Sequence, residues 1–454
     1  MRPPWLREPA DVNLLVPQLW ARHVARAPGG VVSVAGVDVV ELAATFGTPA
    51  YVIDEADFRA RAREFREAFA AAFGAADVYY AGKAFLSLAT VRWLDEEGLH
   101  LDVCTGGELT VALRAGFPAG RIALHGNNKS ETELAQALDA GVGRIVVDST
   151  VEIDRLARLA AERGVSAPVM VRVTVGVQAH THEYVATAHE DQKFGFSLAG
   201  GAAAKAVAAV LAEPSLELLG LHSHIGSQIF DTAAFEVAAR RTVGLLAAIR
   251  DDHGAELPEL DLGGGFGIAY TTQDDPQTPA QLAAGLAEIV GPECRSRGLA
   301  VPTISVEPGR AIAGPSTFTL YRVGTVKTVD LDAGATRTYV AVDGGMSDNI
   351  RAALYDADCS CTLANRRSDA VPVLARVVGK HCESGDVVVR DEFLPGDVEP
   401  GDLIAVPGTG AYGRSLASTY NHVPRPPVVA VRDGLARVIV RRESEEDLLR
   451  LDVG

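Results

Sequence analysis

The 454-residue sequence lacks the features that mark secreted and membrane-spanning proteins. It has only five cysteines, an odd number scattered along the chain, unlike the disulfide framework of a small secreted domain. Its first residues lack the apolar core of a signal peptide, and no stretch is long enough to span a membrane without charge or proline. We therefore expect a cytoplasmic protein with reduced thiols.

The sequence also has fewer positively charged than negatively charged residues. The chain has 42 Lys and Arg against 59 Asp and Glu, and its formal net charge of −17 argues against nucleic acid or an anionic membrane as a partner. An anionic small molecule is compatible with this charge if the site itself holds arginines. Hydrophobic residues make up 48% and charged residues 22%, the balance of a globular protein with large cores.

Eight short apolar runs alternate with alanine-rich helical stretches over the first two thirds of the chain. One such stretch, from Asp54 to Phe73, places phenylalanines on one face at three- and four-residue spacings. Eight strand–helix units in about 250 residues predict an α/β protein with a closed (β/α)₈ barrel. An open doubly wound sheet is the alternative, weakened because no GxGxxG turn follows the first run. The runs are Asp77–Gly82, Leu99–Cys104, Arg121–Gly126, Arg144–Asp148, Pro168–Val175, Glu217–His224, Pro258–Gly263 and Thr303–Glu307.

After about Ala311 the pattern changes to valine- and threonine-rich runs punctuated by glycine and proline. This predicts a mostly antiparallel β-barrel or sandwich domain, which the β-like residues 30–40 are expected to join. We expect an N-terminal segment over residues 1–47, the barrel over 48–310 and the β domain over 311–454. The β runs are Thr317–Thr328, Arg337–Val342, Val371–Val378, Asp386–Arg390, Leu403–Val406 and Val428–Val431.

Unusual polar residues follow several of the predicted barrel strands, where the chemistry of this fold takes place. Lys83 ends the first run between apolar neighbours that would desolvate it, which suits Schiff-base chemistry. A surface lysine is the simpler interpretation of that fragment alone. His222 and His224 end the sixth run on the same side of the strand. They could bind zinc, as in barrel hydrolases, or one could pack while the other contacts a cofactor.

Two further motifs end the last two runs. Gly263–Gly267 follows the seventh, where open backbone N–H groups would suit a phosphate. Glu307 and Arg310 follow the eighth, where a carboxylate could keep a ring nitrogen protonated and a guanidinium could bind an anion. An ordinary ion pair at the Pro308 turn is the alternative. Together with Lys83 these groups are typical of a pyridoxal-phosphate site: an imine former, an anion cradle and a pyridinium partner.

Six short motifs, in their order and spacing, resemble the alanine-racemase-fold decarboxylases, a pyridoxal-phosphate-dependent family, over nearly the whole chain. The resemblance implies a homodimer and, within the family, the branch that decarboxylates meso-2,6-diaminopimelate to L-lysine and CO₂, the last step of lysine biosynthesis. The motifs are Tyr80–Ala84, His222–Gln228, Gly263–Gly267, Glu307–Arg310, His381–Asp386 and Gly410–Tyr412.

The resemblance also implies roles for individual residues. Lys83 resembles the lysine that binds the cofactor as an imine, and His224 the histidine that stacks on its ring. Glu307 resembles the partner of the ring nitrogen. Cys382 resembles the residue that delivers a proton after decarboxylation and that reaches across the dimer interface. The remaining expected cofactor contacts are Ser227, Gly264, Gly265, Gly309, Arg310 and Tyr412.

The resemblance places the far end of the substrate in a second group of residues. Arg310, Arg351 and Tyr355 would bind its distal carboxylate. Glu383 would accept its distal ammonium, and Tyr412 would contact both substrate and cofactor. No metal ion is expected.

Four positions depart from the family pattern. Prolines are common in the family where this chain has Ile350 and Ala352. A cysteine and an aromatic residue often follow Tyr412, where this chain has Gly413 and Arg414. None of the four belongs to the expected catalytic set, but all are near the expected substrate pocket, so they bear on the exact substrate.

Three alternatives stay open on the sequence alone. A sister decarboxylase would act on ornithine, arginine or carboxynorspermidine, but Arg351 and Glu383 argue for a substrate with a distal amino-acid head. A metal-dependent barrel hydrolase would use the histidine pair. A non-catalytic relative would have no need of both Lys83 and Cys382.

Overall fold

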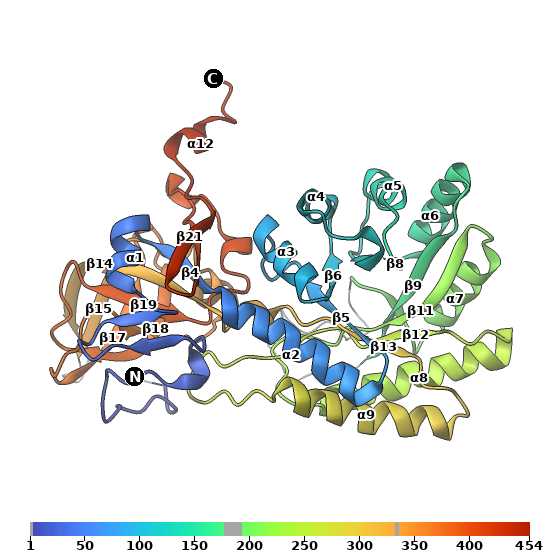
Figure 1. Ribbon diagram of the computed structural model, residues 1–454, viewed down its shortest axis with the longest axis horizontal. Helices are drawn as coiled ribbons and strands as arrows, with labels where there is room; N and C mark the ends of the chain where they lie inside the picture. Colours follow the sequence, from blue (N-terminus) through green and yellow to red (C-terminus); the bar gives the residue numbers. More distant parts are fainter. Residues whose placement is uncertain (1–2, 177–192, 332–335) are drawn as a thin grey trace. The chain divides into compact units, whose positions relative to one another are not determined.

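The computed structural model describes residues 3–176, 193–331 and 336–454, and the chain divides into two compact units (Figure 1). The barrel unit consists of Arg59–Gly267 and Pro276–Gly309, and the β unit of Met1–Phe58, Ile268–Asp275 and Arg310–Gly454.

Eight parallel strands form the barrel unit's ring, which the pairing of β8 with β9 closes. Each of the eight predicted apolar runs supplies one of these strands. The closed barrel is therefore confirmed against the doubly wound alternative. In order of neighbours the strands are β5 (Ala76–Ala81), β6 (His100–Val103), β7 (Ile122–Leu124), β8 (Arg144–Val147), β9 (Ala167–Thr174), β11 (Leu216–His222), β12 (Glu259–Asp261) and β13 (Thr303–Val306), with the short β10 (Phe196–Ser197) beside β9.

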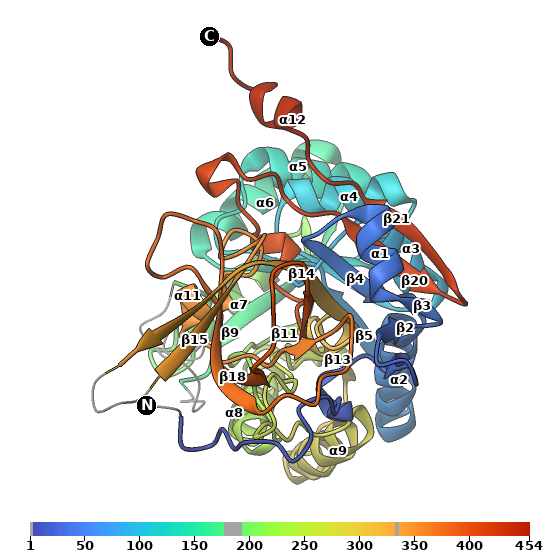
Figure 2. The same ribbon diagram turned by 90° about the vertical axis from the view of Figure 1, so that its left-hand side faces the viewer.

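Helices cover the outside of this strand ring (Figures 1 and 2). The first, α2 (Glu55–Phe73), begins after Asp54, whose Oδ1 accepts the N–H of Asp57 at 3.0 Å. Phe65 and Phe69 on its predicted apolar face are buried, so the helix expected over residues 54–73 is confirmed. The others are α3 (Leu88–Glu96), α4 (Gly106–Ala115), α5 (Glu131–Ala140), α6 (Thr150–Arg163), α7 (Ala202–Ala212), α8 (Ala233–His253) and α9 (Pro279–Ser296), with the 3₁₀ turn η2 (Ala119–Arg121).

The β unit is built on one large sheet in the order β18-β17-β15-β14-β4-β20-β21, with β19 pairing β14 and β16. Most neighbours are antiparallel; β15–β17 and β4–β20 are parallel. The six predicted β runs each form a strand, which confirms the mostly antiparallel domain. The strands are β4 (Ala50–Asp54), β14 (Thr317–Asp330), β15 (Thr336–Val342), β16 (Thr362–Leu363), β17 (Pro372–Val378), β18 (Val387–Pro395), β19 (Leu403–Pro407), β20 (Val428–Arg432) and β21 (Leu435–Val440).

The N-terminal residues belong to the β unit. Val32 and Val34 are fully buried in one core with Phe318 and Val429. Residues 48–58 and 268–275, which we expected in the barrel, also lie in this unit. In the first of these segments, β4 pairs with β14 and β20. The remaining elements are β1 (Val24–Arg26), β2 (Val32–Val34), β3 (Val37–Asp38), α1 (Val39–Phe46), α10 (Arg310–Ala313), α11 (Arg351–Tyr355), α12 (Glu445–Leu449) and the 3₁₀ turns η1 (Pro17–Leu19), η5 (Arg414–Leu416) and η6 (Tyr420–His422).

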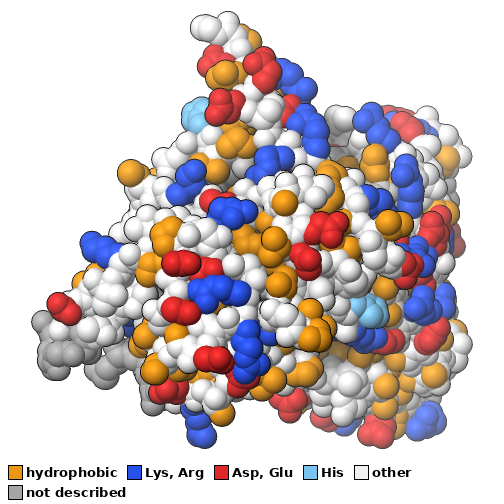
Figure 3. All heavy atoms as spheres, turned by 60° about the vertical axis from the view of Figure 1, so that its left-hand side comes forward, with side chains coloured by type: hydrophobic (Ala, Val, Ile, Leu, Met, Phe, Trp, Pro, Cys, Tyr) orange, Lys and Arg blue, Asp and Glu red, His pale blue; other side chains and the backbone are white. Residues whose placement is uncertain are grey.

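Two surface properties bear on possible partners. Within the described ranges, no helix combines the length and the apolar character that crossing a membrane requires. Figure 3 shows acidic and basic side chains intermingled on one face of the molecule. The net charge of −17 is therefore not gathered into a field of one sign on that face.

Candidate active site

A cavity of about 410 Å³ lies in the barrel unit where the barrel strands end. Its wall includes Lys83, which follows β5, and His224, which follows β11. It also includes His125, after β7, and Glu307, after β13. The volume falls in the range of roughly 300–1,000 Å³ that is usual for small-molecule sites. The barrel thus brings together three of the predicted site residues, Lys83, His224 and Glu307.

Close backbone packing fixes the position of Lys83. The flanking residues Ala81, Gly82 and Ala84 are buried. A Cβ on Gly309 would lie 2.9 Å from the Cβ of Ala81, so the chain after β13 can approach this point only with a glycine. The Lys83 side chain itself is exposed and lines the cavity. Its amine is therefore accessible, and its apolar neighbours do not desolvate it as the sequence suggested.

His224 is a neutral imidazole with a defined tautomer. The Gly264 N–H donates to its Nδ1 at 3.2 Å, so the ring proton lies on Nε2. Burial lowers the pKa of His224 well below its usual value, and the neighbouring Lys83 ammonium lowers it further. An uncharged, oriented ring on the cavity wall is suited to packing against a flat ligand.

The glycine loop Gly263–Gly267 is packed more tightly than an open phosphate cradle. Gly265 has a φ of +104°, and a Cβ there would lie 2.3 Å from the carbonyl oxygen of Gly226. Three of its N–H groups already have acceptors inside the protein: Gly263 donates to Asp261, Gly264 to His224 and Gly267 to Ile229. The phosphate contacts expected of Ser227, Gly264, Gly265 and Gly309 stay a prediction.

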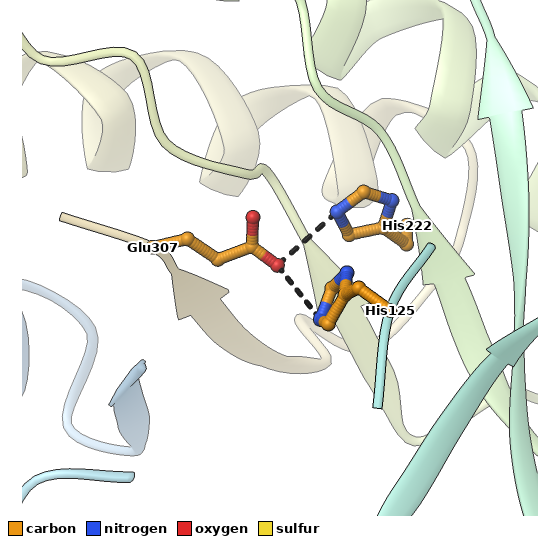
Figure 4. A group of neighbouring side chains, drawn as sticks. All are labelled: His125, His222 and Glu307. Carbon is orange, nitrogen blue, oxygen red and sulfur yellow. Dashed lines mark ion pairs between the residues drawn. The ribbon is translucent and has the colours of Figure 1, made fainter. Parts of the chain in front are cut away.

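Glu307 lies between two histidines (Figure 4). Its Oε1 is 3.3 Å from Nε2 of His125 and 3.2 Å from Nε2 of His222. Burial alone would raise the pKa of Glu307, but the two histidines hold it well below its usual value. The ligand atoms of these three residues lie within 4.8 Å of one another, close enough to hold a metal ion. The sequence had paired His222 with His224; in the structure its neighbour in this group is His125.

A second carboxyl group beside this cluster has its pKa shifted in the opposite direction. Asp102, at 1% exposure, lies 3.7 Å from Nε2 of His125. Burial raises the pKa of Asp102 well above its usual value, and the Glu307 carboxylate raises it further. Of these two carboxyl groups, Glu307 is therefore the one that ionises at the lower pH.

Neutral, buried His125 predicts a pH effect on stability. Its pKa is lowered well below the usual value, first by burial, so His125 takes up a proton below about pH 6.5 only when the chain unfolds. The free energy of unfolding of the barrel unit should then fall with pH, with a His125 contribution of about 1.4 kcal/mol per pH unit. His125→Gln should show a slope shallower by that amount between about pH 6.5 and pH 5.

Urea unfolding followed by Trp93 fluorescence checks this difference. Trp93 is buried in α3 of the barrel unit, and replacing Trp5 and Trp20 by phenylalanine removes the signal of the β unit. Asp102, whose raised pKa has the opposite effect on the slope, is present in both proteins, so the comparison isolates the replacement at position 125. Parallel pH curves for the wild type and His125→Gln would contradict the prediction.

The β unit holds a second group of predicted residues, arranged around a tyrosine. The Arg310 Nη1 donates to the hydroxyl of Tyr270 at 2.6 Å. The Arg351 guanidinium lies over the ring of Tyr270, 3.6 Å from its centroid, and Arg310 lies 4.7 Å from the centroid of Tyr412. Tyr355, at the end of α11, is near enough to contribute to the raised pKa of Arg310. Both arginines are buried, at 8% and 7% exposure.

Two buried guanidinium groups beside one tyrosine ring make a binding site for an anion. Burial alone would lower the pKa of Arg310, yet Tyr270 and Tyr412 raise it, so its charge is retained. Arg351 has no carboxylate partner in the described part of the chain, and its Nε is buried without a hydrogen bond there. A buried charge without a counter-ion is costly. A carboxylate ligand would supply the counter-ion.

Cys382 and Glu383 lie on an exposed loop after β17. The neighbouring His381 fixes this loop, since its Nε2 is 2.8 Å from the hydroxyl of Ser347. The N–H of Cys382 donates to Oδ1 of Asn421 at 3.3 Å. The loop is therefore held firmly while its thiol and carboxylate face outward.

The structure explains some of the four departures from the family pattern, but not all of them. A Cβ on Gly413 would lie 2.5 Å from the carbonyl oxygen of Thr409, so a larger residue does not fit this backbone. Ala352 is buried in α11, and Ile350 precedes that helix. Nothing in the structure explains the arginine at 414.

Sequence reasoning missed three residues of these groups. His125 and Asp102 lie close to the ends of predicted strands, so the rule that found Lys83 and Glu307 could also have found them. Tyr270 carried no such signal, because it lies in a connecting segment between β12 and α9.

Comparison with known proteins agrees with this arrangement. Residues 55–314 match the family model described as "Pyridoxal-dependent decarboxylase, pyridoxal binding domain". The chain is 58% identical to the diaminopimelate decarboxylase of Mycobacterium tuberculosis over 97% of this chain and 98% of that protein. It is 48% identical to that of Bacillus subtilis, over 93% and 95% of the two chains. The structure matches the diaminopimelate decarboxylase of M. jannaschii in complex with L-lysine, with a TM-score of 0.86 and 30% identity over 96% and 98%.

The barrel, its cavity and the family match together define the class: the chain belongs to the pyridoxal-dependent decarboxylases. Within that family it belongs with the diaminopimelate decarboxylases, which it matches over nearly the full length of each protein. The resemblance inferred from the six motifs is confirmed.

The residues of the cavity fit pyridoxal phosphate. An accessible amine at Lys83, a neutral ring at His224 and an ionised carboxylate at Glu307 line one cavity. These are the groups needed to bind an aldehyde, pack on a pyridine ring and pair with its nitrogen.

Proposed function

We propose that this chain decarboxylates meso-2,6-diaminopimelate to L-lysine and CO₂, using one group of residues for each end of the substrate. The observation that carries this proposal is the cavity in the barrel unit, lined by Lys83, His224 and Glu307; the β unit by itself holds two buried arginines. Glu307 and Arg310 are three residues apart, so their Cα atoms lie within about 11 Å of each other in any conformation. We propose on this basis that the two groups serve one small molecule.

At the reacting end, each residue has a chemical task. When bound, pyridoxal phosphate supplies an electron sink for the carbanion left by the loss of CO₂. Lys83 provides the amine that carries the cofactor, and the neutral ring of His224 packs on its face. Glu307 keeps the ring nitrogen protonated. Ser227 with the glycines at 264, 265 and 309 surrounds the phosphate, where Gly264 contributes close packing because its N–H is donated to His224.

At the distal end, selectivity comes from charge. Arg310 and Arg351 bind the distal carboxylate, Tyr355 and Tyr412 close around it, and Glu383 accepts the distal ammonium. Lysine and ornithine lack this carboxylate and would leave both guanidinium groups without an anion. Sites with buried hydrogen-bonding groups reject such analogues by factors of about 10⁴.

One assay tests the function. The purified chain is reconstituted with pyridoxal phosphate and offered meso-diaminopimelate, lysine, ornithine, arginine and carboxynorspermidine, and the amine product and CO₂ are identified. We expect turnover of meso-diaminopimelate to L-lysine. Comparable rates with lysine or arginine would contradict the proposal, and so would absence of CO₂ release from a chain that binds the cofactor.

The exposed loop of Cys382 and Glu383 supports a homodimer whose active sites are shared. The thiol would deliver the proton to the carbon that has lost CO₂, in the partner subunit's site. An outward-facing position on a firmly held loop is the placement that such a reach requires.

Subunit mixing tests the shared site. Cys382→Ala should lower kcat by about 10²-fold or more, and Lys83→Ala should be inactive. Mixing the two variants after mild dissociation should restore about a quarter of the wild-type activity, because about half of the dimers are mixed and each has one intact site. If the mixture stays as inactive as its components, the thiol acts within its own subunit or not at all.

We further propose that the chain acts in the cytoplasm. Its five cysteines are all free thiols, as expected in a reducing compartment.

A further inference from the structure

The strongest unassigned feature of the barrel unit is the contact of two histidines with one carboxylate oxygen. His125, His222 and Glu307 are at most 5% exposed. Both Nε2 atoms approach Oε1 of Glu307, at 3.3 and 3.2 Å, and Figure 4 shows the other carboxylate oxygen directed away from both rings. The two rings meet edge to face, with centroids 5.0 Å apart.

These three atoms need hydrogen-bond partners, and they lie within reach of one another. Oε1 of Glu307 and the two Nε2 atoms are buried, and none of them forms a well-aligned hydrogen bond with any group that the structure describes. Leaving three buried polar atoms unpaired would cost several times about 1–3 kcal/mol. Because His125 is neutral, its ring has one N–H to donate, and donation to Oε1 satisfies donor and acceptor together.

We propose that His125 and His222 are positioning residues, which hold Oε1 of Glu307 so that its other oxygen faces the ring nitrogen of the cofactor. This proposal rests on the proposed function and deepens it. Two donors on one oxygen fix the plane of the carboxylate. They also stabilise its charge, so that the shared proton stays on the ring nitrogen instead of moving to Glu307.

Backbone hydrogen bonds and close packing fix the position of His125. The His125 N–H donates to the Val103 carbonyl oxygen at 2.8 Å, and the next residue, Gly126, could not carry a Cβ, which would lie 2.9 Å from a backbone oxygen. Lys129, at 2% exposure, fixes the end of this loop by donating to the carbonyl oxygens of Gly126 and Val146 at 2.6 and 2.7 Å. Its ammonium also pairs with Glu152 at 2.8 Å.

His222 is fixed in a different way, as the last residue of a central strand. It pairs with Arg172 of β9 on one side and with Asp261 of β12 on the other. A side chain in this register has no freedom to leave the barrel interior. The two imidazoles therefore reach the same oxygen from separate rigid elements.

The neighbouring carboxyl groups differ from Glu307 in the direction of their pKa shifts. Burial and Glu307 raise the pKa of Asp102 well above its usual value, and burial raises the pKa of Asp261 to about 6. Arg144, which contacts Asp261, contributes positive charge from β8. Lys83 and His224 face the group from the cavity side.

The test compares cofactor affinity with and without the ring nitrogen. Pyridoxal phosphate and its 1-deaza analogue, which has C–H in place of that nitrogen, are titrated spectrally into the cofactor-free wild type. The same titrations use His125→Leu, His222→Leu and the matched variants His125→Gln and His222→Gln. A glutamine amide can donate from near the Nε2 position, whereas leucine cannot donate.

The leucine variants should bind pyridoxal phosphate about 10–100-fold more weakly. Their affinity for the deaza analogue should change by less than about twofold, and the glutamine variants should recover most of the loss. Equal weakening for both ligands, or failure of glutamine to rescue, would overturn the proposal and leave the histidines a packing role. Circular dichroism and thermal unfolding confirm that each variant is folded.

Failure of the proposed function is distinguishable from failure of this inference. If the wild type binds pyridoxal phosphate at Lys83 but releases no CO₂ from meso-diaminopimelate, the function is wrong. The comparison of the two ligands still decides whether the histidines act through Glu307, because it measures binding and not turnover.

Discussion

Replacing Lys83 by alanine should lower the kcat for meso-diaminopimelate by about 10⁴-fold or more, the largest effect that we expect of any single change. Lys83 is the amine on the cavity wall that would carry the cofactor between turnovers. On the proposed function, alanine would remove both the covalent attachment and the base for the reaction. The measurement is the initial rate of CO₂ release by holoenzyme at saturating cofactor.

Borohydride trapping decides whether position 83 is responsible. Reduction of the wild-type holoenzyme should fix the cofactor to Lys83, which peptide mass mapping locates, and the alanine variant should not be labelled there. Lys205, an exposed lysine of α7, is the matched control, and its replacement by alanine should leave the rate unchanged. Label on another lysine would remove the basis of the assignment.

The sequence predicted the elements of this protein better than their grouping into units. Apolar runs mark strands because burial acts locally on each residue, so the eight barrel strands and six β runs were each found. The placement of β4 was not, because it depends on pairing with β14 and β20, more than 260 residues away in the chain. Composition alone does not reveal such a partner.

The same limit applies to the site. Lys83, His224 and Glu307 were found because each follows a predicted strand of a fold whose strand ends share one edge. Which of them touch could not be predicted: His222 meets His125 across the barrel instead of joining His224. Tyr270 was missed because its importance comes only from the two arginines that surround it.

The net charge of the whole chain and the local charge at the arginine site have opposite signs. A net charge of −17 disfavours a substrate with two carboxylates. On the proposed function, the two buried arginines would outweigh it at the site, because Coulomb interactions in a confined, poorly solvated site exceed those with distant, screened surface charges.

The second large effect concerns substrate choice. Arg351→Met should lower kcat/KM for meso-diaminopimelate by about 10³-fold or more, while the trace activity towards lysine should stay within about threefold. Methionine keeps much of the length of the side chain and removes its charge. The ratio of the two kcat/KM values is the measurement, and Arg322→Met, at an exposed position of β14, is the matched control. Equal losses for both substrates would show a general structural defect.

Variants of Tyr270 separate two sources of this selectivity, its hydrogen bond to Arg310 and its ring under Arg351. Tyr270→Phe loses the 2.6 Å hydrogen bond to Arg310 but keeps the ring under Arg351, so we expect an increase of about tenfold in KM with little change in kcat. Tyr270→Leu also removes the ring and should approach the loss seen in Arg351→Met. On the proposed function, distal binding of this kind would orient the substrate before reaction. If Tyr270→Leu were no worse than Tyr270→Phe, the stacked guanidinium would contribute nothing, and Arg310 alone would bind the distal carboxylate.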